Sequence, residues 1–191
     1  SQGADNLFAP VDGALSPVAS SFIAGVLTKM PEMTLFFNPL LNSYRRFGAF
    51  EAPRYITWSP QNRSPLIRIP AAQPHHARME LRSADPACNP YWAFALLIHA
   101  GLYGVEHALT LPAPSNLNLY QASSAQIDAL PTLPGTLEQA LIQAEQSTWL
   151  PTCLPAVALE HFLSYKREEW QRFSSHEQPE AYEYERYFPF I

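Results

Sequence analysis

The chain has 191 residues, 47% of them hydrophobic and 13% aromatic, so it can bury a core in one domain and lacks the composition of a disordered chain. Its 12 Lys and Arg against 17 Asp and Glu give a formal net charge of −5, which argues against a nucleic acid partner. The longest apolar run, residues 91–98, is too short to span a membrane.

The first predicted helix begins at Ser16-Pro17, an N-cap followed by a first-turn proline. Apolar residues then recur at helical spacing over residues 22–30, and Pro31 is predicted to end the helix. Residues 32–53 are predicted to form a loop with short extended pieces.

Three strands are predicted in the middle of the chain, over residues 54–59, 66–69 and 78–82. In the third strand charged and apolar residues alternate, which places Arg78, Glu80 and Arg82 on one face. The turn before the second strand carries Arg63. Because Arg68 follows it at an odd spacing of five, the two cannot share a face of one regular strand.

Two helices are predicted after the strands. Asn89-Pro90 begins a helix to about Leu109, which is apolar nearly all round and is therefore expected to be buried. Thr136 and Gln139 form the pattern of a capping box for a helix that ends near Trp149.

A last helix carries an apolar stripe between Leu159 and Phe173, and its charged residues 166–169 are expected to be solvated. These elements predict an α+β fold in a single domain, with antiparallel strands forming one wall of a site and helices behind them. The cysteines, Cys88 and Cys153, lie too far apart to suggest a disulfide framework, so a reducing cytoplasm is the expected setting.

The stretch from residue 38 to residue 82 is cationic within an acidic chain. It holds only two acids, Glu51 and Glu80, and all its cations are arginine: Arg45, Arg46, Arg54, Arg63, Arg68, Arg78 and Arg82. The guanidinium fork binds phosphate and carboxylate bidentately, so the stretch predicts an anion site, with a solvated basic patch as the alternative. From spacing alone, Glu80 is either part of a surface ion-pair ladder or a metal ligand between anion-binding arginines.

The amino-acid sequence from residue 38 onward closely resembles the glutamine synthetase family. The motifs that carry the resemblance are residues 38–46, Glu51-Ala52-Pro53, Asn62-Arg63-Ser64 with Arg68-Ile69-Pro70, residues 80–83, and Asp85-Pro86 with residues 88–91. Residues 166–170 and 185–188 are similar to the C-terminus of that family. The resemblance covers nearly the whole chain, but only the later part of the family's catalytic domain.

The resemblance implies an ATP-dependent ligase. In this family ATP phosphorylates the γ-carboxylate of glutamate, ammonia from ammonium displaces the phosphate, and Mg²⁺ or Mn²⁺ bridges the reacting oxygens. Arg46 and Arg82 match arginines at the substrate glutamate. Arg63 matches an arginine on the ATP phosphates that also touches the transferring group. Glu51 matches the glutamate of a flap that closes the site and takes a proton from ammonium, which makes Glu51 and Arg63 the catalytic candidates.

Further residues are assigned to ATP and metal by the same resemblance. Arg68 matches an arginine on the ATP phosphates, and Arg78 lines the nucleotide site. His75 stands where the family often has a lysine in that site. Glu80 matches the metal-ligand glutamate, and hard oxygen ligands suit Mg²⁺ or Mn²⁺. The loop of residues 47–50 is one residue shorter than the usual family form.

The Glu-x-Glu and His-x-His segments that complete the family's site, and its small N-terminal domain, have no counterpart in these 191 residues. The isolated chain is therefore expected not to make glutamine, whereas the full-length protein is expected to be a homo-oligomer. Two alternatives stay open: a relative that joins glutamate to another amine such as a polyamine, and a non-catalytic module that binds a nucleotide or a partner.

Overall fold

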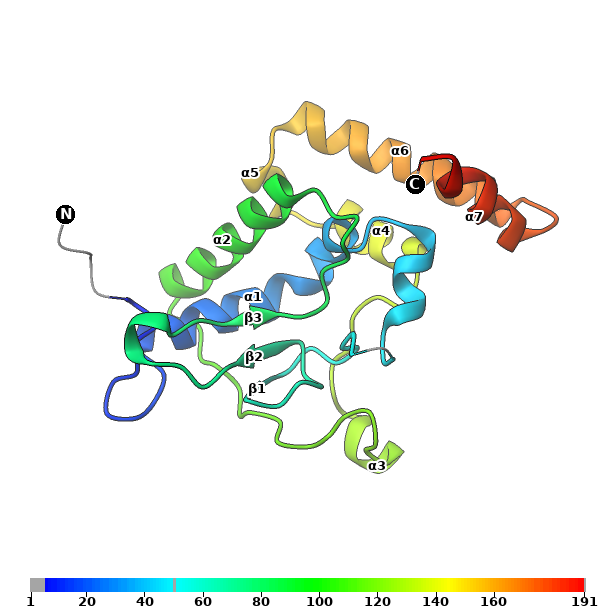
Figure 1. The fold of residues 1–191 in the computed structure, drawn as a ribbon. Helices are drawn as coiled ribbons and strands as arrows, with labels where there is room; N and C mark the ends of the chain where they lie inside the picture. Colours follow the sequence, from blue (N-terminus) through cyan, green and yellow to red (C-terminus); the bar gives the residue numbers. More distant parts are fainter. Residues whose placement is uncertain (1–5, 50, 191) are drawn as a thin grey trace.

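The computed structural model describes residues 6–49 and 51–190 and has an α+β fold, as predicted (Figure 1). Its longer helices are α1 (Pro17–Phe37), α2 (Pro90–Glu106), α4 (Leu137–Glu145), α6 (Ala156–Ser174) and α7 (Pro179–Tyr187). Its short helices are η1 (Leu41–Arg46), η2 (Pro74–His76), α3 (Ser124–Ile127), α5 (Leu150–Cys153) and η3 (Phe188–Phe190). Its strands are β1 (Trp58–Pro60), β2 (Ile67–Ile69) and β3 (Glu80–Leu81).

Helix α1 is the centre of the core, and it passes through Pro31 instead of ending there. The prediction that Pro31 ends the helix is therefore wrong. A proline inside a helix costs about 3 kcal/mol because it lacks an N–H and crowds the preceding turn. Residues on both sides of it, such as Met30 and Met33, are fully buried, and this tertiary packing holds the helix together.

Helices α1 and α2 cross with their backbones in contact at two glycines. A Cβ on Gly25 would lie 2.1 Å from the Ala100 carbonyl oxygen, and a Cβ on Gly104 would lie 2.0 Å from the Ser21 carbonyl oxygen. Both distances are shorter than any real contact, so only glycine permits this crossing.

One face of α2 packs in this crossing, and the opposite face is open. Leu96 and Ala100 are fully buried, whereas the outer face carries Tyr91, Phe94, Ile98 and Leu102, which are 45–83% exposed. The expectation that the whole helix is buried is wrong, because composition cannot tell which face of a helix finds a neighbour. The helix predicted to end near Trp149 is α4, which ends at Glu145.

The sheet is small and mixed, with the order β1-β2-β3. Strands β2 and β3 are antiparallel, as predicted, but β1 and β2 are parallel, which corrects the expectation of an all-antiparallel wall. The connection between β1 and β2 makes a loop that is anchored elsewhere: Ser64 Oγ accepts a hydrogen bond from Leu119 N at 2.9 Å, and Asn62 Nδ2 donates to Leu117 O at 2.7 Å. Strand β2 then pairs with β1 from its start, with Ile67 opposite Trp58.

The expectation that the charged residues 166–169 of α6 are solvated holds for Arg167 and Glu168, which are exposed, and is wrong for Lys166 and Glu169. Lys166 and Glu169 are each only 4% exposed, and Lys166 Nζ lies 2.7 Å from Glu169 Oε2. Helix α7 contacts α6 and shields this pair; Figure 1 shows α7 folded back along α6. Buried charges persist in a fold only when they are paired, and these two are.

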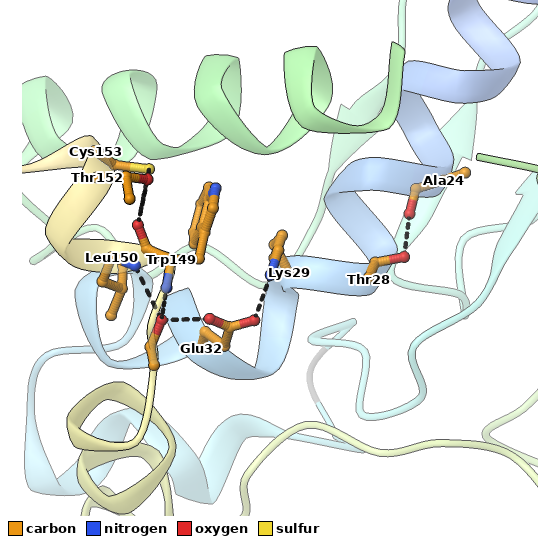
Figure 2. Close-up of polar contacts among 9 residues, drawn as sticks. Ala24, Thr28, Lys29, Glu32, Trp149, Leu150, Thr152 and Cys153 are labelled. Carbon is orange, nitrogen blue, oxygen red and sulfur yellow. Dashed lines mark hydrogen bonds and ion pairs between the residues drawn. The ribbon is translucent and has the colours of Figure 1, made fainter. Parts of the chain in front are cut away.

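A polar cluster ties α1 to the turn between α4 and α5 (Figure 2). Glu32 accepts hydrogen bonds from Lys29 Nζ at 3.0 Å and from the Ser147 hydroxyl, whose oxygen accepts from Trp149 N at 3.2 Å. The Lys29 ammonium also lies over the rings of Tyr103 and Trp149, 4.6 and 5.3 Å from their centroids.

Within the described residues, no helix combines the length and apolarity needed to cross a bilayer.

The glycine crossing makes a first testable prediction. Gly104→Ala should destabilise the fold by about 3 kcal/mol, because the added methyl group meets backbone atoms that cannot move without separating the helices. The matched control is Gly135→Ala, where the new Cβ would meet only Gln139 Oε1 at 3.5 Å. Urea denaturation of both variants measures the difference, and equal stabilities would contradict the described crossing.

Candidate functional site

Glu80 lies between two arginines on one face of the sheet. The antiparallel register places Arg68 of β2 directly opposite Glu80 of β3. Arg68 Nη1 is 3.0 Å from Glu80 Oε2, and Arg78 Nη2 is 3.1 Å from Glu80 Oε1. The predicted strand of residues 78–82 is shorter in the structure, where β3 is Glu80–Leu81, so Arg78 lies just before the strand and meets Glu80 through its ion pair. Each carboxylate oxygen of Glu80 thus has its own guanidinium.

Glu51 forms a second group with two other arginines. Its carboxylate oxygens lie 3.4 Å from Arg82 Nη2 and 3.7 Å from Arg63 Nη1. Arg82 is 14% exposed in its side chain, whereas Glu51 and Arg63 are each 63% exposed. Arg63 lies in the β1–β2 loop, outside the strands, as predicted. Glu51 thus lies between Arg82, which the family resemblance assigns to the substrate glutamate, and Arg63, which it assigns to the ATP phosphates.

The backbone of Glu51 is in the left-handed region, with φ of 61°. This conformation is uncommon for a residue with a side chain and occurs mostly where the surrounding structure imposes it. Here the loop closes on itself, since Gly48 N donates to Ala52 O at 2.8 Å and Ala52 N donates to Ala49 O at 2.9 Å. The loop therefore aims Glu51 at Arg63 and Arg82.

Arg46, the last residue of η1, is held by inner contacts. Its Nη2 donates to Asn38 Oδ1 at 2.9 Å and to Ser83 O at 3.0 Å, and its Nε lies 3.4 Å from Asp85 Oδ2. Asp85 is in turn fixed, because its backbone N–H donates to Phe37 O at 2.8 Å. Neither Asn38 nor Asp85 had been assigned a site role from sequence. The signal was available, since both lie in the motifs quoted above.

Three donors in this region are buried and make no hydrogen bond among the described residues: Arg82 Nη1, Ser83 Oγ and Arg46 Nε. Of these, Arg46 Nε still has an ionic partner, Asp85 Oδ2 at 3.4 Å. The three donors lie close together, because Ser83 follows Arg82 and its carbonyl binds Arg46. Buried donors are nearly always hydrogen-bonded, so a group of donors without hydrogen bonds indicates a place for a ligand with acceptor oxygens.

Tyr120 is a neighbour of this region that the sequence did not indicate. Partial burial raises the pKa of its hydroxyl, the Arg82 charge lowers it and the Glu51 charge raises it. It belongs to the connector after α2, where the sequence has no periodic pattern that could have predicted its position.

His75 lies apart from both ion-pair groups. It is exposed on η2, and its ring lies 4.1 Å from that of His76. Asn6 Nδ2 anchors this turn by donating to Ala77 O at 2.9 Å. The structure thus places His75 near Arg78 in the chain, but records no bond between the two side chains within the described residues.

A divalent cation fits Glu80 as a single protein ligand. Among the residues that the structure describes, no three His, Cys, Asp or Glu side chains come together as a metal cluster. Mg²⁺ is commonly held by one or two carboxylates together with phosphate oxygens and water, so one carboxylate is enough protein ligand where phosphate supplies the others. The structure itself shows four arginines whose charge is partly neutralised by two glutamates.

Comparison with known proteins gives the family. The family model described as "Glutamine synthetase, catalytic domain" matches residues 1–187. The chain therefore belongs to the glutamine synthetase family.

The chain is 40% identical over 164 residues to a glutamine synthetase of Methanosarcina mazei. This alignment covers 84% of the chain and 37% of that protein. The chain is 38% identical over 177 residues to that of Staphylococcus epidermidis, in an alignment that covers 90% of the chain and 40% of that protein. A solved structure described as "GmaS/ADP complex-Conformation 1" superimposes with a TM-score of 0.82 at 30% identity, over 99% of this chain and 44% of the other. The chain thus spans less than half the length of these relatives.

The position of Glu51 makes a second testable prediction. Glu51→Gln should tighten binding of inorganic phosphate by the 191-residue chain, because the phosphate no longer competes with a carboxylate for Arg63 and Arg82. The gain should be roughly two- to fivefold, since exposed ion pairs are worth up to about 1 kcal/mol. The control is Glu106→Gln, an exposed residue at the end of α2. Calorimetric titration at low salt measures both, and weaker binding by Glu51→Gln would count against the competition.

Proposed function

We propose that this chain is part of an ATP-dependent ligase that forms glutamine from glutamate and ammonia through a γ-glutamyl phosphate. The observation that carries the proposal is the pairing of Arg63 and Arg82 with Glu51 and of Arg68 and Arg78 with Glu80. Arg46 binds the Ser83 carbonyl next to Arg82, and buried donors without a hydrogen bond, Arg82 Nη1 and Ser83 Oγ, lie beside it. Phosphoryl transfer between two anionic substrates requires such a dense set of fixed cations. Membership of the family and the likeness to an ADP complex support it.

The proposed nucleotide half of the site is the group around Glu80. Arg68 and Arg78 bind phosphate oxygens, together with Arg63 from the neighbouring loop. The family resemblance also assigns His75 to this nucleotide half. Glu80 would hold Mg²⁺ or Mn²⁺, which would supply neutralisation of phosphate charge. When phosphate arrives, each arginine exchanges its bond to Glu80 for bonds to phosphate, which frees the carboxylate for the metal.

The proposed acceptor half is the group around Glu51. Arg82 and Arg46 orient the carboxylates of glutamate, and Arg63 stabilises the charge on the phosphoryl group during transfer. Glu51, released from its arginines by the incoming substrate, attracts ammonium and accepts its proton. Ammonia can then attack the acyl phosphate, and phosphate leaves.

Other parts of the proposal rest on the family resemblance. The relatives are more than twice as long as this chain, so the 191 residues by themselves are proposed to be inactive. The complete protein is proposed to act as a homo-oligomer in the cytoplasm. Ammonia is proposed as the acceptor because the relatives at 38–40% identity are named glutamine synthetases.

The metal assignment gives a third testable prediction, made in the protein expressed from its complete gene. Glu80→Ala should lower ATP-dependent glutamine formation at least 100-fold, because the metal loses its ligand in this strand while Arg68 and Arg78 lose their counter-charge. Glu160→Ala, on the exposed surface of α6, should leave the rate unchanged. Turnover is measured as glutamine and phosphate released at varied Mg²⁺, and full activity of Glu80→Ala would refute the assignment.

The choice of acceptor is tested with the same protein. Glutamine formation from ammonium should exceed product formation from methylamine or putrescine at equal concentration. If methylamine or putrescine gave more product than ammonium, that amine and not ammonia would be the acceptor. Nucleotide binding without ATP-dependent product from any acceptor would favour the non-catalytic module and overturn the ligase.

A further inference from the structure

A buried polar network connects the C-terminal helices to η1. At its centre is Glu169 of α6, whose side chain is 2% exposed. One carboxylate oxygen binds Lys166 Nζ at 2.7 Å, and the other accepts a hydrogen bond from the Tyr187 hydroxyl at 3.1 Å. Arg186 Nε lies 3.6 Å from the same oxygen that Tyr187 binds. The orientation of the Tyr187 hydroxyl is thus fixed by a buried, already paired carboxylate.

The Tyr187 hydroxyl also accepts a hydrogen bond from Leu41 N at 3.0 Å, across 146 residues of sequence. Leu41 is the first residue of η1, and the first N–H groups of a helix have no acceptor within the helix. Tyr187 supplies that acceptor. Burial and the nearby Glu169 raise the pKa of Tyr187, so its hydroxyl keeps the proton that it donates to Glu169.

A second contact holds the other end of η1. Glu183 Oε1 accepts a hydrogen bond from Arg45 Nη2 at 2.7 Å. Glu183 and Tyr187 are four residues apart on α7 and therefore lie on one face of it. One face of α7 thus binds both the beginning of η1, at Leu41, and its penultimate residue, Arg45.

Helix η1 needs such external contacts. It is a 3₁₀-helix of six residues, and runs longer than three or four residues are uncommon because the hydrogen-bond geometry is poor. Its last residue is Arg46, whose guanidinium binds Asn38 and Ser83 and lies beside Asp85. A shift of η1 along its axis would move Arg46 away from these partners and from the unpaired donors next to them.

We propose that Tyr187 is a positioning residue for substrate binding: through Leu41 it fixes η1 so that Arg46 is held at the site of the substrate carboxylate. The inference rests on the proposed function, because it assigns Arg46 to glutamate. Tyr187 touches neither substrate nor nucleotide. Its effect should therefore fall on glutamate binding and leave the nucleotide half, which β2 and β3 carry, unchanged.

The test is Tyr187→Phe in the protein expressed from its complete gene. This change removes one oxygen and keeps the ring. KM for glutamate should rise at least fivefold, while kcat and KM for ATP stay within twofold of wild type. Tyr184→Phe is the matched control, because Tyr184 lies on the same helix but is 60% exposed. Its three constants should equal those of wild type.

A second variant separates positioning from general loss of structure. Glu183→Gln weakens the Arg45 contact and leaves Tyr187 and Glu169 in place, so it should raise KM for glutamate in the same selective way. An unchanged KM for glutamate in Tyr187→Phe, or equal losses in KM for ATP and in kcat, would overturn the positioning role. A wild-type protein that forms no product would instead overturn the proposed function, and the two failures are thereby distinct.

Discussion

The close crossing of α1 and α2 is the constraint on which the position of the site depends. Residues 38–89, which hold every candidate side chain, leave from the end of α1 and return to the start of α2. The glycines at the crossing allow the two helix backbones to touch, so both ends of this segment start from a rigid platform. The described residues of this segment have little regular structure, only three short strands and two 3₁₀-helices. Its geometry is therefore set by its ends and by its polar contacts.

Electrostatic repulsion is the main obstacle to this arrangement, since five arginines are gathered in a small region. The structure offsets it with carboxylates placed between them: Glu80 between Arg68 and Arg78, and Glu51 between Arg63 and Arg82. These pairs are partly exposed, so each contributes little to stability and can be exchanged at low cost. Such a site is stable without ligand and still able to transfer its arginines to an anion. The buried Lys166–Glu169 pair differs, because breaking it would leave a buried charge that neither water nor a partner compensates, so this pair cannot be exchanged at low cost.

Local sequence patterns predicted those structural features that depend only on residues close together in the sequence. Asn89, for example, accepts hydrogen bonds from the first turn of α2 as its capping pattern indicates. Periodicity gives the faces of an element but does not identify which face is covered. For that reason it missed the burial of Lys166 and Glu169 and the open face of α2.

The resemblance to the family supplied roles for site residues that no periodicity could give, and Glu51 in its irregular loop is the clearest case. Contacts between residues far apart in the sequence could not be predicted from any local pattern. The bond from Leu41 to Tyr187 joins a residue in a predicted loop to one for which no helix or strand was predicted. The contacts of Asn62 and Ser64 with residues 117–119, which anchor the loop between β1 and β2, could not be predicted in this way either.

Glu51, the residue proposed for the flap, combines a strained backbone with ion pairs that can be exchanged. A left-handed backbone costs a residue with a side chain about 1–2 kcal/mol, and at Glu51 the strain is balanced by loop hydrogen bonds and by the attraction of two arginines. An anion that takes over Arg63 and Arg82 removes the second contribution, and the balance then shifts toward a different loop conformation. The arginines proposed to bind the anion are thus the ones that pair with Glu51 in this loop. Arg46, in contrast, is held by Asn38, Ser83 and the η1 contacts of α7, so one wall of the site stays fixed while the loop can move. This division between a fixed wall and a movable loop follows from burial, because Asn38 and Asp85 are buried while Glu51 is exposed.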